Sequence, residues 1–537
     1  MAKRLYINLL RQQRVREGLI FLSGLVAGMW FIALNAVGSD FSFFPGDLGD
    51  ARFNNYLLEH AYRFFTGKEA SFWSAPFMYP EKNVITYSDN LLGTAPFYAF
   101  FRMCGADRES AFQWWYLLMA LLNYSCAYLF LRHLTKHAMA AVLGAIVFAF
   151  SIALQSQLGH AQTFPRFMIP LSFWAAILYH RELKVKYLFL SLFCWVYQMY
   201  CGIYLGFMLV VPLAFLFTGG VLVRWQSYCM RIKSSRWVLQ VSVSLLVNAA
   251  LLLILMVPYI ERAHTLKPYP YEQVMTTLPT LSSYLFSTGG SCFWDALMNV
   301  GNDLPYSWDF KIFPGGIALL SLAIVFAMAT RDGFLRKQKA WLPLSGAQSM
   351  TLLSLTVTLL FFLQMDGFSF YRLLHLLPGF ASMRALQRII NIDILLFATA
   401  LSLVSDCLFT WKFKLSKFLF PVLLLLLIVD NRIVPGSVFK VSKQGAQTRV
   451  KELVEKIKTT DSETILSYES DTLEHLQYIL QIDGMLAGQE VGFPTLNGYS
   501  ATAPLGFDAY WVRPNEETRR VWLKQKGFSE EHLQVYH

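Results

Sequence analysis

The chain has 537 residues, of which 55% are hydrophobic, 16% aromatic and only 15% charged, and its formal net charge is +11. So apolar a composition excludes an ordinary soluble domain and indicates a polytopic membrane protein. In such a protein an excess of basic residues is typical of membrane orientation, so we expect no binding to nucleic acid.

Apolar runs long enough to cross a ~30 Å hydrocarbon core recur along the chain. The first is Leu19–Gly38, and the others begin near Ser110, Ala138, Phe164, Tyr187, Ile203, Val238, Phe313, Ser349, Ile389 and Lys417. Tyr187–Gly219 is too long for one helix, and we divide it at "YCGIY" into a hairpin of two spans. The pattern predicts about eleven transmembrane helices.

The charges of the connecting loops predict the topology. With the N-terminus in the cytoplasm, every cytoplasmic connection is rich in Lys and Arg. The opposite loops carry the acids Asp40, Asp47, Asp50, Asp89, Asp295, Asp303 and Asp309. This positive-inside pattern predicts that the N-terminus lies inside and the C-terminal region outside.

The first outer loop, residues 39–109, is long for a mere connection, and loops of this length are usually functional. Leu91–Gly105 is interrupted by Pro96 and Arg102, so we interpret it as a helix in the outer interface rather than a span. The aromatic residues Trp73, Tyr79 and Tyr87 suit a loop wall that faces substrate, although aromatic rings also gather at membrane interfaces.

Asp47 and Asp50 lie at the start of this loop, among glycines and a proline. Two such acids can bind a divalent cation, or one can act as general base toward a hydroxyl while the other orients it. Alternatively they are solvated loop acids, or Asp50 is the N-cap of the amphipathic helix predicted in "GDARFNNYLLEHAYRFF".

Two later outer segments carry candidate ligands for a phosphate or a sugar. "QLGHAQTFPRF", Gln157 to Phe167, offers His160 and Arg166, and the alternative is a histidine that merely ends an interfacial helix. Arg384 and Arg388 precede the tenth helix, and their spacing of four predicts one helical face with two guanidinium forks. The alternative for these arginines is binding to lipid headgroups or to loop acids.

The composition changes after the last apolar run. We predict a transmembrane domain over residues 1–436 and a small soluble α/β domain over 437–537. Within the latter we expect a helix in "TRVKELVEKIK", a strand in "ETILSY", and a final helix in "NEETRRVWLKQKG" that Asn515 opens and Gly527 closes.

The order of these parts resembles the GT-C superfamily of membrane glycosyltransferases. The likeness is strongest to a bacterial multi-pass subfamily, through "GDLGDARFNNYLLEHAYRF", "FWSAPFMYPEKNVITYSDNLLG", "FAFSIALQSQLGHAQ", "LLPGFASMRALQRI" and "LNGYSATAP". It covers most of the chain, from Phe43 to about Pro504. A WWDYG-like signature is missing, which argues against protein N-glycosylation.

The resemblance implies an inverting transferase in the bacterial cytoplasmic (inner) membrane. Such an enzyme passes a sugar from a polyprenyl-phosphate carrier to a glycan, lipid or protein acceptor at the outer face. By position, Asp50 or Asp47 is the base. The residues expected to bind the donor phosphate are His160, Arg166, Arg384 and Arg388. A divalent cation, Mg or Mn, remains open. The alternatives are a transporter or flippase for lipid-linked glycans and a non-catalytic scaffold.

Overall fold

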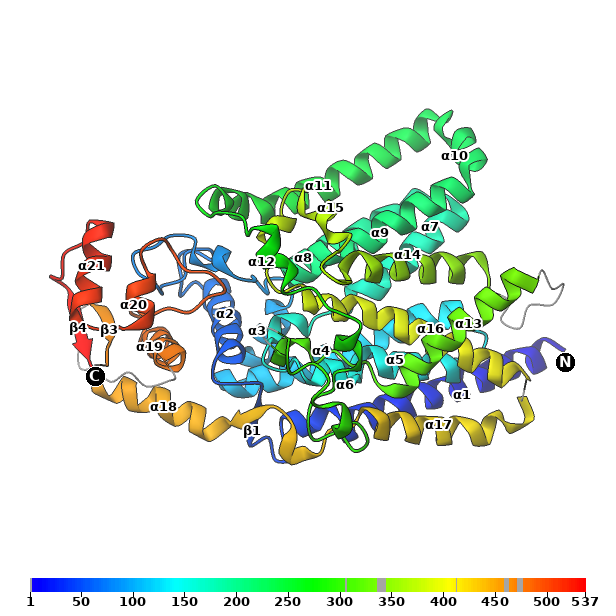
Figure 1. Cartoon of the computed structure of the whole chain (residues 1–537), viewed down its shortest axis with the longest axis horizontal. Coiled ribbons are helices and arrows are strands. Elements are labelled where there is room, and N and C mark those ends of the chain that lie inside the picture. Colours follow the sequence, from blue (N-terminus) through cyan, green and yellow to red (C-terminus); the bar gives the residue numbers. More distant parts are fainter. Residues whose placement is uncertain (1, 305–306, 336–343, 412, 458–462, 471–476) are drawn as a thin grey trace.

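The computed structural model describes every residue except 1, 305–306, 336–343, 412, 458–462 and 471–476. Long helices run side by side, with the N-terminus at one end of the molecule and the C-terminus at the other (Figure 1). Each predicted apolar run forms a helix: α1 (Ala2–Phe31), α4 (Arg108–Leu134), α5 (Ala138–Phe150), α7 (Met168–Glu182), α8 (Val185–Cys201), α9 (Ile203–Val223), α11 (Ser235–Ala263), α13 (Gly316–Leu335), α14 (Gly346–Phe362), α16 (Ile390–Trp411) and α17 (Ser416–Asn431).

Not all of these helices have the length of a membrane span. Within the described residues, 6 helices are long and apolar enough to cross a membrane, which makes the chain a multi-pass membrane protein. The helices α7, α8 and α17 have only 15, 17 and 16 residues. At about 1.5 Å per residue they fall short of a ~30 Å core, so the count of eleven spans stays a prediction.

The centre of the bundle is the contact between α5 and α16. All of α5 is buried, and its small residues let α16 approach closely. A Cβ atom added at Gly144 would lie 2.0 Å from Ser402 Oγ and 2.5 Å from the Ala398 carbonyl oxygen. The two helices therefore pack backbone to backbone at this point.

Two local predictions are confirmed. The chain breaks at Gly202 between α8 and α9, and Asp89 Oδ1 accepts a hydrogen bond from the Ile203 amide at 2.5 Å, which caps α9. In the first outer loop, the segment around Pro96 forms α3 (Ala95–Met103), whose 9 residues are too few to span a membrane, while its predicted place in the outer interface stays a prediction.

The remaining helices are short or lie outside the bundle: α2 (Asp50–Phe65), α6 (Ile152–Gln155), α10 (Trp225–Ile232), α12 (Tyr271–Met275), α15 (Tyr371–His375), α18 (Lys443–Lys456), α19 (Gln477–Val491), α20 (Asp508–Val512) and α21 (Glu516–Lys526). Strand β1 (Phe43–Pro45) pairs antiparallel with β2 (Lys440–Ser442), and β3 (Ile465–Tyr468) pairs parallel with β4 (Leu533–Tyr536). As predicted, the Asn515 side chain caps α21 and Gly527 ends it at φ +71°.

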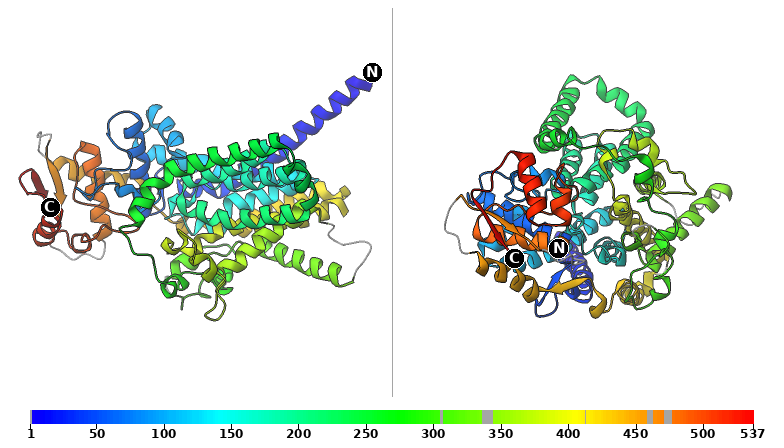
Figure 2. Two further views of the ribbon diagram at one scale, coloured as in Figure 1. Left: turned by 90° about the horizontal axis from the view of Figure 1, so that it is seen from above. Right: turned by 60° about the vertical axis from the view of Figure 1, so that its left-hand side comes forward.

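The C-terminal elements lie against the first outer loop. Figures 1 and 2 show α18 to α21 beside α2, at the end of the molecule opposite the N-terminal part of α1. Phe77 of the loop and Trp522 of α21 are fully buried in one cluster, and Trp522 Nε1 donates to the Tyr79 carbonyl at 2.8 Å. The region after residue 437 therefore shares a hydrophobic core with the loop.

A buried ion pair joins the same two regions. Arg52 of α2 contacts Asp483 of α19 at 2.6 Å, with side-chain exposures of 4% and 3%, and Arg449 reaches the same carboxylate at 2.5 Å. Removing one partner of such a pair leaves a buried charge uncompensated.

Asp483→Asn should therefore destabilise the protein by roughly 3–5 kcal/mol. Glu455→Gln is the control, because Glu455 and Lys451 form an exposed pair at 3.8 Å, and surface pairs contribute about 0–1 kcal/mol. Denaturation of the detergent-solubilised protein measures both values. Equal unfolding midpoints for the two variants would contradict a supporting role for Asp483.

Candidate functional site

Asp47 and Asp50 have different structural roles at the start of α2. Asp47 Oδ1 accepts a hydrogen bond from the Ala51 amide at 2.9 Å, so Asp47 caps the helix. Asp50 is the first residue of α2 and makes no capping hydrogen bond. The interpretation of Asp50 as an N-cap is therefore wrong, because the preceding turn presents Asp47 to the helix amides instead.

A close backbone approach brings this turn to the segment 157–167. Gly46 has φ +96°, and a Cβ there would lie 2.6 Å from the Leu158 carbonyl oxygen. Only glycine fits both the conformation and the space. Asn54 Nδ2 also donates to Gln162 Oε1 at 2.9 Å, so two contacts hold α2 against the segment that carries His160.

His160 lies between two carboxylates. Its Nδ1 is 2.9 Å from Asp50 Oδ2, and its Nε2 is 2.9 Å from Asp309 Oδ1. Because ionised carboxylates only accept hydrogen bonds, both ring nitrogens must donate, which requires the charged imidazolium. The side chains of His160, Asp50 and Asp309 are 21%, 22% and 21% exposed, so each is partly accessible to solvent.

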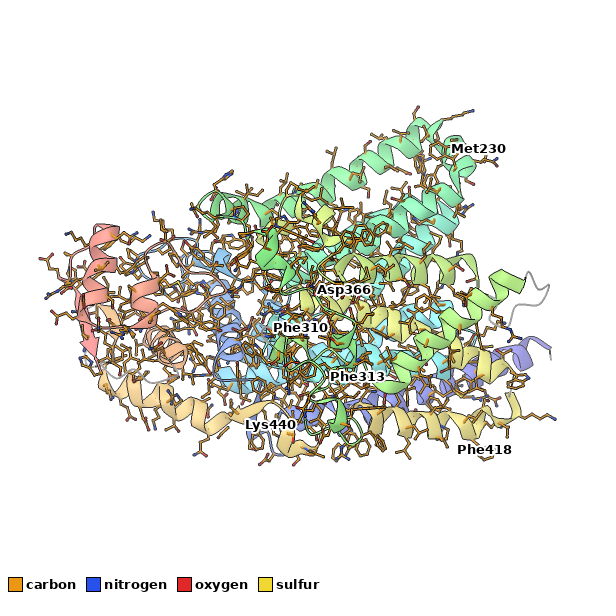
Figure 3. The ribbon with its side chains drawn as sticks, viewed as in Figure 1. Met230, Phe310, Phe313, Asp366, Phe418 and Lys440 are labelled. Carbon is orange, nitrogen blue, oxygen red and sulfur yellow. The ribbon has the colours of Figure 1, made fainter. Side chains whose placement is uncertain are left out.

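Asp309 comes from the long connection between α11 and α13. Its neighbours Phe310 and Phe313 are buried, at 1% and 2% exposure, and anchor this segment. Figure 3 labels both phenylalanines near the middle of the molecule. The site is thus assembled from segments that are far apart in sequence.

The charges of the cluster shift its ionisation equilibria. Burial would raise the pKa of Asp50, but the hydrogen bond and charge of His160, the charge of Arg388 and the hydroxyl of Tyr499 lower it to about 2. Burial and Arg388 lower the pKa of His160, yet Asp309 and Asp50 outweigh them and raise it above its ordinary value. Burial alone would raise the pKa of Asp309, but the hydrogen bond and the charge of His160 lower it below its ordinary value.

Asp47 behaves in the opposite way. Burial raises its pKa to about 6, against the hydrogen bond from Ala51, and the nearby negative charge of Asp50 adds to the rise. At neutral pH Asp50 is firmly ionised, while Asp47 titrates close to neutrality.

Arg388 supplies a second positive charge. Its Nη2 lies 3.3 Å from His160 Nδ1, whereas Asp50 Oδ2 lies 2.9 Å away, so we assign the hydrogen bond of the Nδ1–H group to Asp50. Its Nε is buried and has no hydrogen-bond partner among the residues that the structure describes. Arg388 therefore keeps donor capacity beside the carboxylate.

The prediction that Arg384 and Arg388 share a helical face is wrong. The helical segment around Arg388 begins at Leu386, and Met383 and Ala385 are in non-helical conformations. The Arg384 amide donates instead to the Tyr204 hydroxyl at 2.9 Å, and the Arg388 guanidinium lies 5.5 Å from the centre of the same ring. Tyr204 of α9 thus holds both positions.

Tyr499 completes the cluster from the C-terminal region. Its hydroxyl donates a short hydrogen bond to Asp50 Oδ1. Its ring packs against Phe53 and Trp511, with centroid distances of 5.3 and 5.5 Å. Both oxygens of Asp50 are consequently engaged.

The other predicted site residues lie outside this cluster. Arg166 is buried, and its Nη1 donates to the Thr163 carbonyl at 2.8 Å and to Asn391 at 3.3 Å. Trp73 packs on Tyr259, Tyr79 on Phe528, and Tyr87 bonds to Glu81 and Arg262. Their predicted contacts with a substrate stay predictions.

The donor set does not fit a divalent cation at Asp47 and Asp50. Asp47 is committed to the helix cap, and Asp50 and Asp309 both accept from His160. Over the described part of the chain, no group of three or more His, Cys, Asp or Glu side chains has the arrangement of a metal site.

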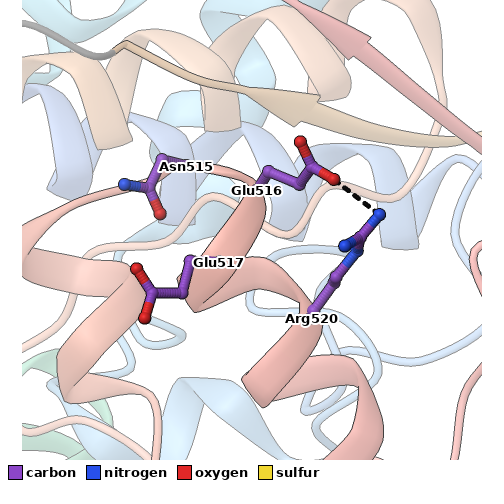
Figure 4. Close-up of a pocket in the computed structure, with 4 residues that line it drawn as sticks. All are labelled: Asn515, Glu516, Glu517 and Arg520. Carbon is purple, nitrogen blue, oxygen red and sulfur yellow. Dashed lines mark ion pairs between the residues drawn. The ribbon is translucent and has the colours of Figure 1, made fainter.

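A surface pocket lies elsewhere, at the start of α21. It is lined by Asn515, Glu516, Glu517 and Arg520 (Figure 4). Glu516 and Arg520 form an exposed ion pair at 2.5 Å within one helix. This pocket shares no residue with the cluster around His160.

Sequence reasoning missed two members of the cluster. Asp309 stood out only as one acid among several in the outer loops, and Tyr499 only as part of "LNGYSATAP". The recurrence of that motif in resembling proteins is the one signal that pointed to this segment. No spacing rule links residues that lie 149 and 449 positions from their partners.

The fold resembles that of an archaeal oligosaccharyltransferase, in agreement with the GT-C-like fold that the sequence predicts. The chain is similar to the Archaeoglobus fulgidus oligosaccharyltransferase AglB in complex with an inhibitory peptide and a dolichol-phosphate, with a TM-score of 0.51 and 11% identity over 96% of this chain and 69% of that chain. The apo form of the A. fulgidus enzyme gives 0.50 and 13% over 95% and 69%. The complex of the A. fulgidus oligosaccharyltransferase with Zn and sulfate gives 0.48 and 12% over 90% and 62%, so in that comparison the chain spans less than two thirds of the other chain. No protein-family model and no curated protein sequence matches the chain.

The raised pKa of His160 predicts a pH-dependent stabilisation. The contribution of the imidazolium is fully present below the unfolded-state pKa of about 6.5 and is lost as the pH rises through the higher folded-state pKa. The difference in melting temperature between wild type and His160→Gln should therefore be largest near pH 6 and shrink on the alkaline side. A difference that is constant or grows with pH would show that His160 is not charged in the fold.

Proposed function

We propose that the protein is a membrane glycosyltransferase that moves a sugar from a polyprenyl-phosphate carrier to an acceptor at the outer face of a bacterial cytoplasmic membrane. The observation that carries the proposal is the Asp50 carboxylate beside His160 and Arg388, in a chain with a GT-C fold. One carboxylate and two cations are the groups that deprotonation of an acceptor and binding of a phosphate require.

In the proposed reaction, Asp50 is the general base. An acceptor oxygen attacks the anomeric carbon while its proton passes to Asp50. The bond between that carbon and the phosphate oxygen breaks, and the polyprenyl phosphate leaves with the electron pair. Attack opposite the leaving group inverts the configuration. Asp47 supports α2 and places Asp50, because its own carboxylate binds the Ala51 amide.

Binding of the donor would make Asp50 a stronger base. A carboxylate whose pKa is about 2 removes a proton only weakly, and His160 and Arg388 contribute to that low value. A phosphate bound between these two cations would offset their charge at Asp50. The pKa of Asp50 would then rise, so the base gains strength when the donor is in place.

Arg388 is our candidate for the contact with the donor phosphate, because its buried Nε has no partner among the described residues and Asp50 is adjacent. Arg384 is exposed and close enough to act electrostatically on Tyr499, so it can contact the phosphate from the open side. Arg166 lies deeper, on Asn391, and its predicted role toward the phosphate would need a different contact.

Asp50→Asn should reduce sugar release from a radiolabelled polyprenyl-phosphate donor by about 10²- to 10⁴-fold, the usual contribution of a general base. Purified protein in lipid is offered one donor sugar at a time, with cell extract as the source of acceptor. Asp40→Asn is the matched control, an exposed acid of the same loop that bonds to the Ser42 amide at 3.2 Å. Full activity of Asp50→Asn would refute the assignment, and no release by wild type from any donor would favour transport or a scaffold.

Arg388→Gln should raise the KM for the donor roughly 10- to 100-fold, because a hydrogen bond to a charged group contributes about 1.5–3 kcal/mol. Arg372→Gln serves as control, since Arg372 is an exposed arginine that lies 5.9 Å from the Tyr271 ring. Steady-state rates at varied donor concentration separate KM from kcat. Equal KM values for the two variants would remove Arg388 from the phosphate site.

A further inference from the structure

The hydroxyl of Tyr499 donates to the oxygen of Asp50, the proposed base, that His160 does not contact. Asp50 Oδ2 accepts from His160, and Oδ1 accepts from Tyr499. In the transfer reaction the acceptor must hydrogen-bond to this carboxylate before it loses its proton. His160 donates to Oδ2 and Tyr499 donates to Oδ1, so an acceptor hydroxyl that takes the place of the Tyr499 O–H exchanges one donor on this carboxylate for another of the same kind.

Tyr499 is held there by the segment that carries it. Met78 and Thr502 amides donate to the Asn497 and Tyr87 carbonyls, at 3.1 and 3.3 Å, so the segment around Tyr499 is bonded to the first outer loop on both sides. The rings of Phe53 and Trp511 flank the Tyr499 ring. The backbone of Tyr499 is therefore fixed beside Asp50. Only the Tyr499 side chain has to rotate for its hydroxyl to leave the Asp50 carboxylate.

We propose that the Tyr499 hydroxyl holds the place of the acceptor in the resting site, and that the acceptor reacts through a hydroxyl group of its own. The proposal rests on the proposed glycosyl transfer by Asp50. A hydroxyl replaces Tyr499 with the same kind of O–H hydrogen bond, so the carboxylate is never left without a donor on this oxygen. The indole of Trp511 beside it is only partly buried and suits the ring of a sugar, which makes a carbohydrate the acceptor class that we favour.

Water and simple alcohols can also displace the Tyr499 hydroxyl from Asp50, because they too carry a hydroxyl group. Attack by water gives the free sugar and polyprenyl phosphate, and attack by glycerol gives a glyceryl glycoside and the same phosphate. In both cases the hydroxyl proton passes to Asp50 and the phosphate takes the electron pair of the broken bond.

Tyr499→Phe tests the proposal, because it removes the hydroxyl and keeps the ring between Phe53 and Trp511. We expect release of sugar to water, without other acceptor, to rise by about two- to tenfold, the equivalent of one net hydrogen bond. The concentration of glycerol that gives half-maximal transfer should fall by a similar factor. Loss of the Tyr499 hydrogen bond should also move the acid limb of the pH–rate profile to higher pH.

The matched control is Tyr536→Phe. Tyr536 belongs to the same C-terminal region, and its buried hydroxyl has no hydrogen-bond partner within the residues that the structure describes. This variant loses the same atom and should leave release, glycerol dependence and pH profile unchanged. Adding Asp50→Asn to Tyr499→Phe should abolish the gain.

The outcomes separate the two proposals. Release that persists in Asp50→Asn would overturn the proposed function itself. Release that depends on Asp50 but is unchanged or lower in Tyr499→Phe would overturn only the role of Tyr499, because a group that stabilises the transition state lowers the rate when it is removed.

Discussion

The contact of His160 with Asp50 and Asp309 is the interaction on which the candidate site depends. Two carboxylates from separate segments of the chain repel each other, and the energy of that repulsion grows as water is excluded. A protonated imidazole with one N–H on each carboxylate converts the repulsion into two charge-assisted hydrogen bonds. The protonated ring of His160 thereby joins the segments around residues 50, 160 and 309. Because the ring must be protonated to do so, the stability of the site depends on pH, which packing alone would not cause.

This ionic contact is supported by a hydrophobic core that two distant parts of the chain build together. The first outer loop supplies Phe77 and Tyr56, and the C-terminal region supplies Trp522 and Tyr510, all fully buried. The antiparallel pairing of β1 with β2 also joins these two parts of the chain, next to Asp47. Because Tyr499 lies in the same region, the C-terminal elements both stabilise the loop that carries Asp50 and contribute a hydrogen bond to it.

Features that depend on neighbouring residues could be predicted from the sequence. The break at Gly202, the cap at Asn515 and the end of α21 at Gly527 each follow from the conformational preference of one residue in its local context. The candidate residues Asp50, His160 and Arg388 were identified individually, from their positions in outer loops. Their contacts were not, because the partners are 110 and 228 residues apart and no local rule pairs them.

Arg384 shows the limit of a spacing argument. A separation of four residues places two side chains on one face only if the backbone between them is helical. Here the Arg384 amide donates its hydrogen bond to Tyr204, a residue of another helix. The amide therefore needs no helical hydrogen bond, and the helical segment begins only at Leu386. The result still brings both arginines to the site, through tertiary contact rather than through helical period.

The balance of charge in the cluster bears on the proposed binding of an anionic donor. Asp50 and Asp309 are offset by His160 and Arg388, so the cluster is close to neutral before anything binds. An arriving phosphate would need positive charge that is not wholly paired, and two groups offer it: the Arg388 Nε, which has no partner within the described part of the chain, and the exposed Arg384. In the proposed reaction, a phosphate bound there would offset the charge of the cations at Asp50 and leave its carboxylate a better proton acceptor, so occupation of the donor site and strength of the base would be coupled through the same two cations.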